Sequence, residues 1–480
     1  MTTLGAESAR VSPKVPEREV IARTLAYTLS GIVACLWTAD PDLWGHLRFG
    51  LDAIRDRGLA SIDPYSFTSD IPWINHEWLS EVAMAIAYLA AGVPGMLALK
   101  TALAGSALAL LAWHARHTTA PARWWVLAAA AVLTAPVMLT LRPQLWTVLW
   151  LAVIATTTSW PLGRLALVWP IVFALWANLH GGWIVGLGVV GAWALGTVMD
   201  TRRWRPIVSL AGVWSLCAVA TLLTPYGTRL WLFIRDTVGL NRYDISEWQP
   251  IWVEGASLWL ASLILVGILL RRATWAWAAV LPVVMLGLAS VKVGRLGGLW
   301  VVVAVGVLLP RWRKTELPQS FPPLLLAIVI LVSILPSGFM LASESRCLRS
   351  YGWESPDFEA AGALLPASGR LMVPFGWGQY AIWHFGPRLK VSFDGRRETV
   401  YSAARIAEQH GLTSENSSIL PFIQSKRPEY IWVPRPKGDN VANRLLMSGY
   451  RADITTQRSM ILTRADLPAL PPGSMSACFP

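Results

Sequence analysis

Charged residues are scarce in this chain of 480 residues: only 15% are Asp, Glu, Lys or Arg, whereas 54% are hydrophobic. Soluble globular domains carry about 25% charged residues, so the composition excludes an ordinary soluble protein and indicates an integral membrane protein. No small-residue cleavage site follows the first apolar run, and we expect that run to remain as an anchor. Tryptophan, in contrast, is plentiful with 28 residues, as expected for rings that collect at membrane interfaces.

Cysteine is also rare, with four residues, which excludes a scaffold built on disulfides. Cys35 and Cys217 fall in apolar runs and are interpreted as small core residues. Cys347 and Cys478 fall in the tail, and the sequence leaves their pairing open. We find no internal repeat, no low-complexity segment and no zinc-type spacing of Cys and His.

Apolar runs long enough to cross a membrane are the dominant feature of the chain. A span needs roughly 17–25 apolar residues. We predict spans near residues 20–38, 95–113, 124–141, 144–161, 165–179, 183–199, 206–223, 256–270, 274–290, 296–309 and 323–342. The predicted fold class is therefore an all-α polytopic membrane domain of about 11 transmembrane helices, followed by a small extracytoplasmic α/β domain.

The net charge is +12, and the distribution of the basic residues indicates the orientation of the chain in the membrane. With the N-terminus in the cytoplasm, the basic runs Arg202-Arg203, Arg271-Arg272 and Arg311-Trp312-Arg313 all fall in inner loops, as the positive-inside rule expects. We therefore expect no nucleic-acid partner. The predicted organisation is a cytoplasmic tail (1–19), a membrane domain (20–342) with outer loops 39–94 and 224–255, and an extracytoplasmic α/β domain (343–480).

Two helices are expected in the first outer loop. Residues 43–58 have the spacing of an amphipathic helix on the membrane surface. Residues 76–89 form either an interfacial helix or a twelfth span, and the loop charges favour the first. In the tail, strand-like runs (370–374, 389–393, 430–433, 459–462) alternate with helix-like runs (356–365, 397–410, 443–448).

Two acids, Asp40 and Asp42, directly follow the first apolar run. Carboxylates at the mouth of a membrane helix are costly unless they are solvated, paired or used. An ionised carboxylate can accept a proton from a hydroxyl, so one acid is a candidate general base while the other binds a divalent metal, Mg or Mn, or orients the acceptor. The alternative for Asp42 is that it caps the helix starting at Leu43.

Other polar residues share the predicted outer face with this pair, which suggests an outward-facing cavity. The carboxylates and imidazoles among them are candidates for substrate binding: His46, Asp63, His76, Glu77 and His180. His180 could equally be a turn residue before Gly181-Gly182. The cations Arg142, Lys292 and Arg295 are candidates for binding a phosphate. Snorkelling to lipid head groups is the competing interpretation for each of them.

Three motifs give the chain a family resemblance. They are Asp40-x-Asp42-x-Trp44-x-His46-Leu47, then Asp63-Pro64-Tyr65-Ser66-Phe67-Thr68 with Glu77-Trp78-Leu79, and in the tail Trp377-Gly378-Gln379-Tyr380 with Asp394-Gly395-Arg396. With the span count, they resemble a poorly characterised bacterial group in the GT-C-fold superfamily of membrane glycosyltransferases. The resemblance covers nearly the whole chain.

The resemblance implies transfer of a sugar from a polyprenyl-phosphate donor to a glycan or lipid acceptor, at the outer face of the bacterial inner (plasma) membrane. Asp40 would be the base and Asp42 the second acid, while Arg295 or Lys292 would hold the lipid phosphate. No long loop with an acceptor-peptide motif is evident, so we expect glycan or lipid modification rather than protein glycosylation.

Two other functions remain open from the sequence. A transporter or flippase for lipid-linked glycans would also use charged outer groups, but it predicts polar spans and internal repeats. A non-catalytic membrane protein would bind a glycan or a partner through its outer domain. Asp394-Gly395 would then matter more than Asp40, although the same pair could be a simple turn after a strand.

Overall fold

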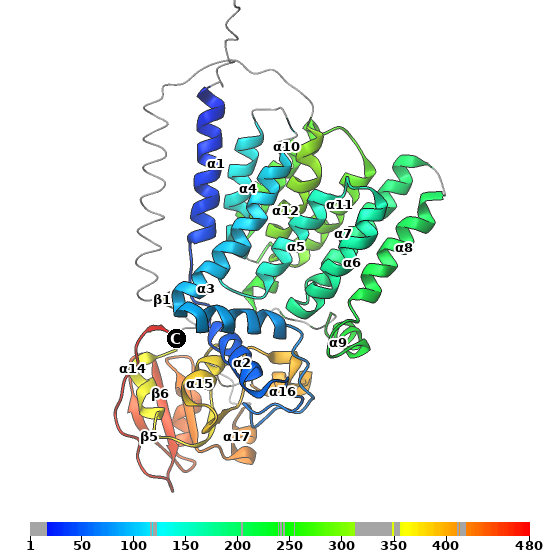
Figure 1. Cartoon of the computed structure of the whole chain (residues 1–480). Coiled ribbons are helices and arrows are strands. Elements are labelled where there is room, and N and C mark those ends of the chain that lie inside the picture. The colour runs from blue at the N-terminus through cyan, green and yellow to red at the C-terminus, as the bar shows by residue number, and fades with distance from the viewer. Residues whose placement is uncertain are drawn as a thin grey trace, which may run out of the picture.

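The chain folds into a helical bundle with a smaller α/β domain at one of its ends (Figure 1). The computed structural model describes residues 17–115, 118, 122–202, 205–238, 240, 242, 245–253, 255–312, 348–349, 356–409, 412 and 419–480. We call the part from residue 348 onward the C-terminal domain, and the end of the bundle that faces it the domain end.

Apolar helices run side by side through the bundle. They are α1 (Glu17–Cys35), α4 (Arg123–Thr134), α5 (Gln144–Thr157), α6 (Leu162–Leu179), α7 (Trp183–Thr201), α8 (Arg205–Ala220), α10 (Ala256–Arg272), α11 (Trp277–Lys292) and α12 (Leu296–Leu308). Among the described residues, three helices are long and apolar enough to cross a membrane: Trp78–Ala115, Leu162–Leu179 and Trp183–Thr201. The protein is a membrane protein. The predicted run 323–342 lies outside the described residues, so the count of eleven spans stays a prediction.

The two helices predicted at 76–89 and 95–113 form one kinked helix, α3 (Trp78–Ala115). The kink lies at Ala91 and Gly92, where Gly92 has a φ of 61°, a conformation that glycine adopts without strain. Figure 1 shows the first part of α3 crossing the domain end of the bundle and the second part running along the bundle. Whether residues 76–89 lie at the interface or form a further span stays a prediction.

A buried lysine holds the end of α1. Lys100 is fully buried, and its Nζ donates to the carbonyls of Val33 (2.7 Å), Ala34 (2.9 Å) and Leu36 (2.6 Å). The last carbonyls of a helix lack partners within the helix and carry partial negative charge, so an ammonium group is well placed there. The contact fixes the chain immediately before Asp40.

The C-terminal domain contains a five-stranded mixed sheet in the order β3-β2-β4-β6-β5. Strands β2 (Gly369–Met372), β3 (Leu389–Val391) and β4 (Tyr430–Pro434) are parallel, whereas β6 (Ser459–Arg464) and β5 (Tyr450–Thr455) extend the sheet antiparallel. The other elements are α14 (Phe358–Ala361), α15 (Gly378–Phe385), α16 (Ala403–Gln409), α17 (Leu420–Lys426), α18 (Asp439–Leu446) and the short pair β1 (Leu348–Arg349) and β7 (Cys478–Phe479).

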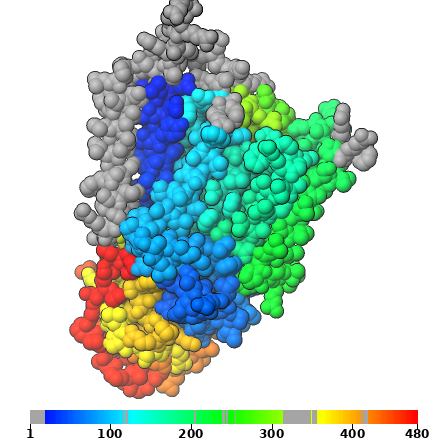
Figure 2. Space-filling model, viewed as in Figure 1, coloured from blue at the N-terminus to red at the C-terminus, as the bar shows by residue number. Residues whose placement is uncertain are grey.

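The loop after α1 joins the two parts. Its helix α2 (Leu43–Asp56) packs on α15, and the Trp44 ring contacts Tyr380 and Phe479, each with ring centroids 5.3 Å apart. Further on, Ser66 forms an isolated parallel bridge with Val391 of β3, so the loop pairs with this edge of the sheet. In Figure 2 the medium-blue residues of this loop lie between the light-blue residues of the bundle and the yellow residues of the C-terminal domain.

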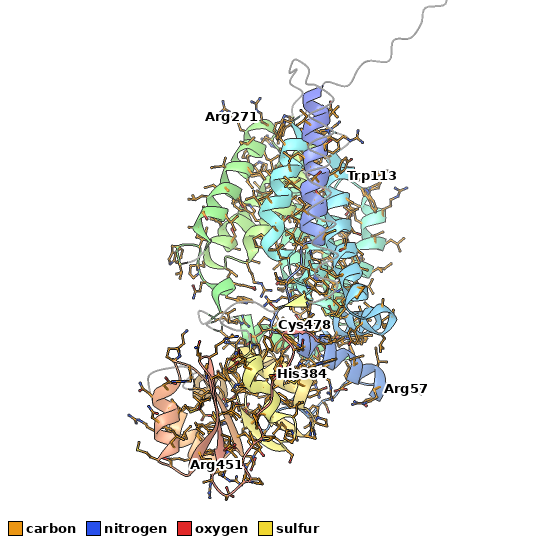
Figure 3. All side chains as sticks on the ribbon, turned by 90° about the vertical axis from the view of Figure 1, so that its left-hand side faces the viewer. Arg57, Trp113, Arg271, His384, Arg451 and Cys478 are labelled. Carbon is orange, nitrogen blue, oxygen red and sulfur yellow. The ribbon has the colours of Figure 1, made fainter. Side chains whose placement is uncertain are left out.

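The cysteines in the bundle differ from the cysteine in the C-terminal domain. Cys35 and Cys217, both in bundle helices, are free. Cys478 forms a disulfide, whereas Cys347 lies outside the described residues. Figure 3 shows Cys478 near the junction of the two parts, with Arg271 and Arg451 at opposite extremes of the molecule.

Candidate functional site

The acid pair and Arg142 meet because two distant segments pair at the domain end. Thr38 forms a parallel bridge with Thr140, and the Thr38 N–H donates to the carbonyl of Leu139 at 3.4 Å. Asp40 lies two residues after the first threonine and Arg142 two residues after the second. In a parallel pair such residues lie beside each other, and Arg142 Nη2 forms an ion pair with Asp40 Oδ2.

Three carboxylates surround the Arg142 guanidinium. Besides Asp40, they are Glu247, whose Oε1 accepts from Nη1 at 2.7 Å, and Asp42, whose Oδ2 lies 4.0 Å from Nη2. Burial acts to lower the pKa of Arg142, but Asp40, Glu247 and Asp42 outweigh it and raise that pKa. We call Asp40, Asp42, Glu247 and Arg142 together the Arg142 cluster.

The two aspartates have different environments. Asp40 is buried, and both of its oxygens are engaged: Oδ1 accepts the Asp42 N–H at 2.8 Å, and Oδ2 pairs with Arg142. The Asp42 side chain is 32% exposed. Asp42 does stand at the N-cap of α2, but its side chain makes no capping hydrogen bond. The capping alternative for Asp42 is therefore wrong.

Arg295 lies next to the cluster. Its backbone N–H donates to the Glu247 carbonyl at 3.0 Å, and its side chain contacts the Gln144 amide oxygen. Its Nε lies 3.9 Å from Glu247 Oε2, and its guanidinium lies 5.3 Å from the Trp248 ring centroid. Burial lowers the pKa of this arginine, which nevertheless remains charged at any ordinary pH.

A second group forms around Glu77, between two histidines. Glu77 Oε1 lies 3.6 Å from both His76 Nε2 and His180 Nε2. The Gly182 N–H donates to His180 Nδ1 at 3.0 Å, and Thr147 Oγ1 lies 2.7 Å from the same nitrogen. An accepting Nδ1 places the proton of a neutral imidazole on Nε2, toward Glu77. Burial lowers the pKa of His180 to about 3, so this ring stays neutral.

His46 forms a third contact from α2 to α3. Its Nδ1 lies 3.1 Å from Glu81 Oε1, and Glu81 Oε2 accepts from Asn75 Nδ2 at 2.6 Å. Burial opposes the charged imidazole, but the bond to Glu81 and the charges of Glu81, Glu77 and Asp42 prevail and raise the pKa of His46 to about 9. His46 is therefore cationic at neutral pH.

This ion pair predicts a pH dependence of stability. The folded-state pKa of about 9 lies above the ordinary value of 6.5, so the His46–Glu81 pair contributes fully below pH 6.5 and is lost as the pH rises through 9. The contribution is about 3 kcal/mol, since one pKa unit corresponds to about 1.4 kcal/mol. Thermal unfolding in detergent between pH 6 and 10 should show this loss, and His46→Gln should remove it. Parallel pH profiles for the two proteins would contradict the assignment.

Two glycines allow the C-terminal domain to lie in close contact with Asp42 and helix α2. A Cβ added to Gly395 would lie 2.0 Å from Asp42 Oδ1 and 2.5 Å from Gln379 Nε2, and one added to Gly45 would lie 2.0 Å from Gln379 Oε1. Neither position has room for a side chain, because Gln379, only 3% exposed, lies between Gly45 of α2 and Gly395. The Asp394-Gly395-Arg396 motif is thus in contact with Asp42.

Gly395→Ala is expected to displace the Asp42 carboxylate while leaving the chain folded. A shift of about 1 Å in a reacting group can lower a rate by about 10²-fold, so any activity that depends on Asp42 should fall by one to two orders of magnitude. The rate at which the lipid-linked sugar expected from the family resemblance is consumed measures this. Gly212→Ala on α8 is the matched control, because its added Cβ would meet nothing within 4 Å. Equal rates for the two variants would show that the contact between Gly395 and Asp42 does not affect the reaction.

Two of the site residues predicted from the sequence, Asp63 and Lys292, lie outside the groups described above. Asp63 is paired with Arg396: its two oxygens accept from Nη1 at 2.7 Å and Nη2 at 2.9 Å, and the same arginine also binds Asp394. The Asp63 side chain is fully buried, so it joins the loop to the C-terminal domain. Lys292 is exposed at the last residue of α11.

Sequence reasoning missed several members of the site. Glu247 and Gln144 were not among the candidate site residues, because each belongs to a short polar stretch at a helix end and gave no stronger signal. Glu81 lies within an apolar-looking helix and gave no signal of its own. Asn75 gave no signal in the sequence, and Gln379 was noticed only as part of the Trp377-Gly378-Gln379-Tyr380 motif, without a role.

The chain shares its overall fold with solved structures of an oligosaccharyltransferase, in agreement with the GT-C fold expected from the sequence motifs. The oligosaccharyltransferase AglB from Archaeoglobus fulgidus, in complex with an inhibitory peptide and a dolichol-phosphate, superposes with a TM-score of 0.53 at 11% identity, over 86% of this chain and 69% of that chain. Its apo form gives 0.51 at 10% identity, over 87% and 69%. The form tethered to an acceptor peptide gives 0.50 at 11%, over 86% and 68%. No protein-family profile and no curated protein matches the chain.

Proposed function

We propose that the chain is a membrane glycosyltransferase that moves a sugar from a polyprenyl-phosphate donor to a glycan or lipid acceptor. The observation that carries the proposal is the joint placement of the Asp40–Asp42 pair and the cation Arg295 at the domain end of an apolar bundle. A lipid-linked donor needs a carboxylate near the acceptor and a cation near the leaving phosphate, both within reach of the bilayer. The GT-C fold supports this reading.

The reaction assigns one task to each charge. The acceptor oxygen forms a bond to the anomeric carbon of the sugar, and the bond from that carbon to the phosphate oxygen breaks. The electron pair leaves with the lipid phosphate, while the acceptor proton goes to a carboxylate. Between the two aspartates, we assign the base to Asp42, because its side chain is the more exposed. Asp40 would orient Arg142, rather than act as base.

The leaving phosphate needs a cation that is already in place. Negative charge grows on this phosphate as the bond breaks, and a fixed positive group stabilises it most in a site with little water. We assign this role to Arg295, whose guanidinium is held by Gln144 and Glu247. Lys292, exposed three residues earlier, would meet the lipid phosphate at the rim.

The partners follow from this assignment. The AglB structures contain a dolichol-phosphate or an acceptor peptide, which supports a lipid-phosphate donor here. For the acceptor we propose a glycan or lipid, since this chain lacks a recognisable acceptor-peptide loop. We propose the bacterial inner membrane as the location, with a cytoplasmic N-terminus and an extracytoplasmic C-terminal domain.

The sequence left open a divalent metal, Mg or Mn, bound by one of the two aspartates. In the described part of the chain, no group of three or more His, Cys, Asp or Glu side chains is arranged to hold a metal ion. The carboxylates nearest to such an arrangement, Asp40, Asp42 and Glu247, converge on Arg142 instead. These residues therefore do not fit a metal, and no step of the reaction is assigned to one.

A strain lacking the protein tests the proposal. We expect it to accumulate one polyprenyl-phosphate-linked sugar and to lose one envelope glycan, both measured by mass spectrometry. The wild-type chain should restore the profile and Arg295→Met should not. Arg271→Met is the matched control, because Arg271 lies at the far end of the bundle (Figure 3). Unchanged lipids and glycans in the deletion strain would refute the proposal.

Purified protein in liposomes separates the transferase from the flippase. A transferase releases polyprenyl phosphate when donor and acceptor extract are supplied together. A flippase moves the intact donor between leaflets and releases no phosphate. Movement without release would replace our proposal by the second function.

A further inference from the structure

One arginine stands where three acids converge. The carboxylates come from two segments far apart in the sequence, Asp40 and Asp42 after α1 and Glu247 in the 3₁₀ turn η2 (Ser246–Trp248). Convergence of carboxylate oxygens on one point is the arrangement that binds Mg²⁺ or Mn²⁺. Here the point is occupied by the Arg142 guanidinium, which uses Nη1 for Glu247 and Nη2 for Asp40 and Asp42.

The position of Arg142 is fixed by the fold. Its segment pairs with the Asp40 segment through Thr38 and Thr140, and its neighbour Gln144 contacts Arg295. Only 19% of the Arg142 side chain is exposed. A cation that displaced this side chain would have to bury it elsewhere or move it into water, and it would break two charged hydrogen bonds.

The charges of the cluster are also compensated to within one unit without a metal. The cluster has three carboxylates, while Arg142 and the adjacent Arg295 supply two positive charges. The remaining oxygen of Asp40 is already satisfied by the Asp42 N–H at 2.8 Å. Mg²⁺ demands near-ideal octahedral geometry at about 2.0–2.1 Å, so an Asp40 carboxylate held on both oxygens by the protein is a poor ligand.

We propose that Arg142 is the resident cation of this acid cluster and takes the place of a divalent metal ion. As such it is a positioning residue: it holds Asp40 and Glu247 in place and leaves the Asp42 carboxylate to face the acceptor. The inference deepens the proposed function, but it is tested without any sugar donor. Its failure and that of the proposed function can therefore be told apart.

Binding of Mn²⁺ alone tests the inference. The full-length chain in detergent is titrated with MnCl₂, and free Mn²⁺ is followed by its room-temperature electron paramagnetic resonance signal. Binding to the wild type should be unchanged by Asp40→Asn. Arg142→Gln should gain one Mn²⁺ per chain, with an affinity at least tenfold above that of the wild type. The double variant Arg142→Gln/Asp40→Asn should lose the gained site.

A matched control removes the same charge elsewhere. Arg235→Gln on α9 (Thr228–Val238) deletes an exposed arginine paired with Asp236 and should gain no site. One stoichiometric Mn²⁺ on the wild type that Asp40→Asn abolishes would overturn the inference, and so would a folded Arg142→Gln protein with no new site. The comparison of wild type with Asp40→Asn decides the question even where Arg142→Gln does not fold.

Discussion

Asp42→Asn is expected to slow sugar transfer by about 10²–10⁴-fold, the usual loss when a general base is removed. The amide keeps the shape of the side chain but cannot accept the acceptor proton. Asp42 makes no capping bond to α2 and its ion pair with Arg142 is partly exposed, so the variant should lose at most about 1 kcal/mol of stability. Initial rates of donor consumption, measured with purified protein in liposomes, give the comparison.

Asp40→Asn distinguishes a base from a positioning group. It should also lower the rate, because the Asp40 carboxylate holds Arg142, but the acid limb of the pH–rate profile should survive. Asp42→Asn should remove that limb, since the base titrates there. The exposed Asp236→Asn serves as the control. Loss of the acid limb in Asp40→Asn alone would return the base to Asp40, the role implied by the family resemblance.

Elements with one strong signal could be predicted from the sequence. The apolar runs at 144–161, 165–179 and 183–199 correspond to α5, α6 and α7, because a continuous apolar run has few other solutions in a lipid phase. The surface helix at 43–58 corresponds to α2, whose apolar side is set by its periodicity.

Elements with mixed signals were missed. Strand β5 is half exposed and carries Arg451 and Asp453, so it lacks a clear apolar run. Helix α15 begins at Gly378, and its Trp-Gly-Gln-Tyr sequence drew attention as a motif rather than as a helix. In both segments tertiary contacts override a weak local preference.

Only part of the site could be predicted from the sequence, again because tertiary contacts decide the rest. Proximity to a span end identified Asp40 and Asp42, since a carboxylate there needs an explanation. Their partners depend on pairings across about a hundred residues, which no local pattern records: the contact from Asp40 to Arg142 follows from the bridge between Thr38 and Thr140. The same limit made Asp63 look like a ligand, because its partner Arg396 is 333 residues away.

The pairing of Asp63 with Arg396 gives the largest expected loss of stability. Arg396 binds Asp63 and Asp394 through hydrogen bonds of 2.7 to 2.9 Å, and both carboxylates are fully buried. Its guanidinium also lies 4.8 Å from the Trp73 ring centroid. Removing one partner of a buried pair leaves an uncompensated charge and costs about 3–5 kcal/mol, so Arg396→Met should destabilise the protein by this amount.

The pH dependence of that loss identifies its cause. Burial alone acts to raise the pKa of Asp394, whereas Arg396 holds it below its ordinary value. Without the arginine, the buried carboxylates should take up protons on folding, so Arg396→Met should be closer to the wild type at pH 5 than at pH 8. Thermal unfolding at both pH values measures the gap. Arg235→Met, which breaks a pair whose two side chains are both exposed, should cost far less stability. A pH-independent loss in Arg396→Met would point to lost packing against the aromatic rings instead of the unpaired charge.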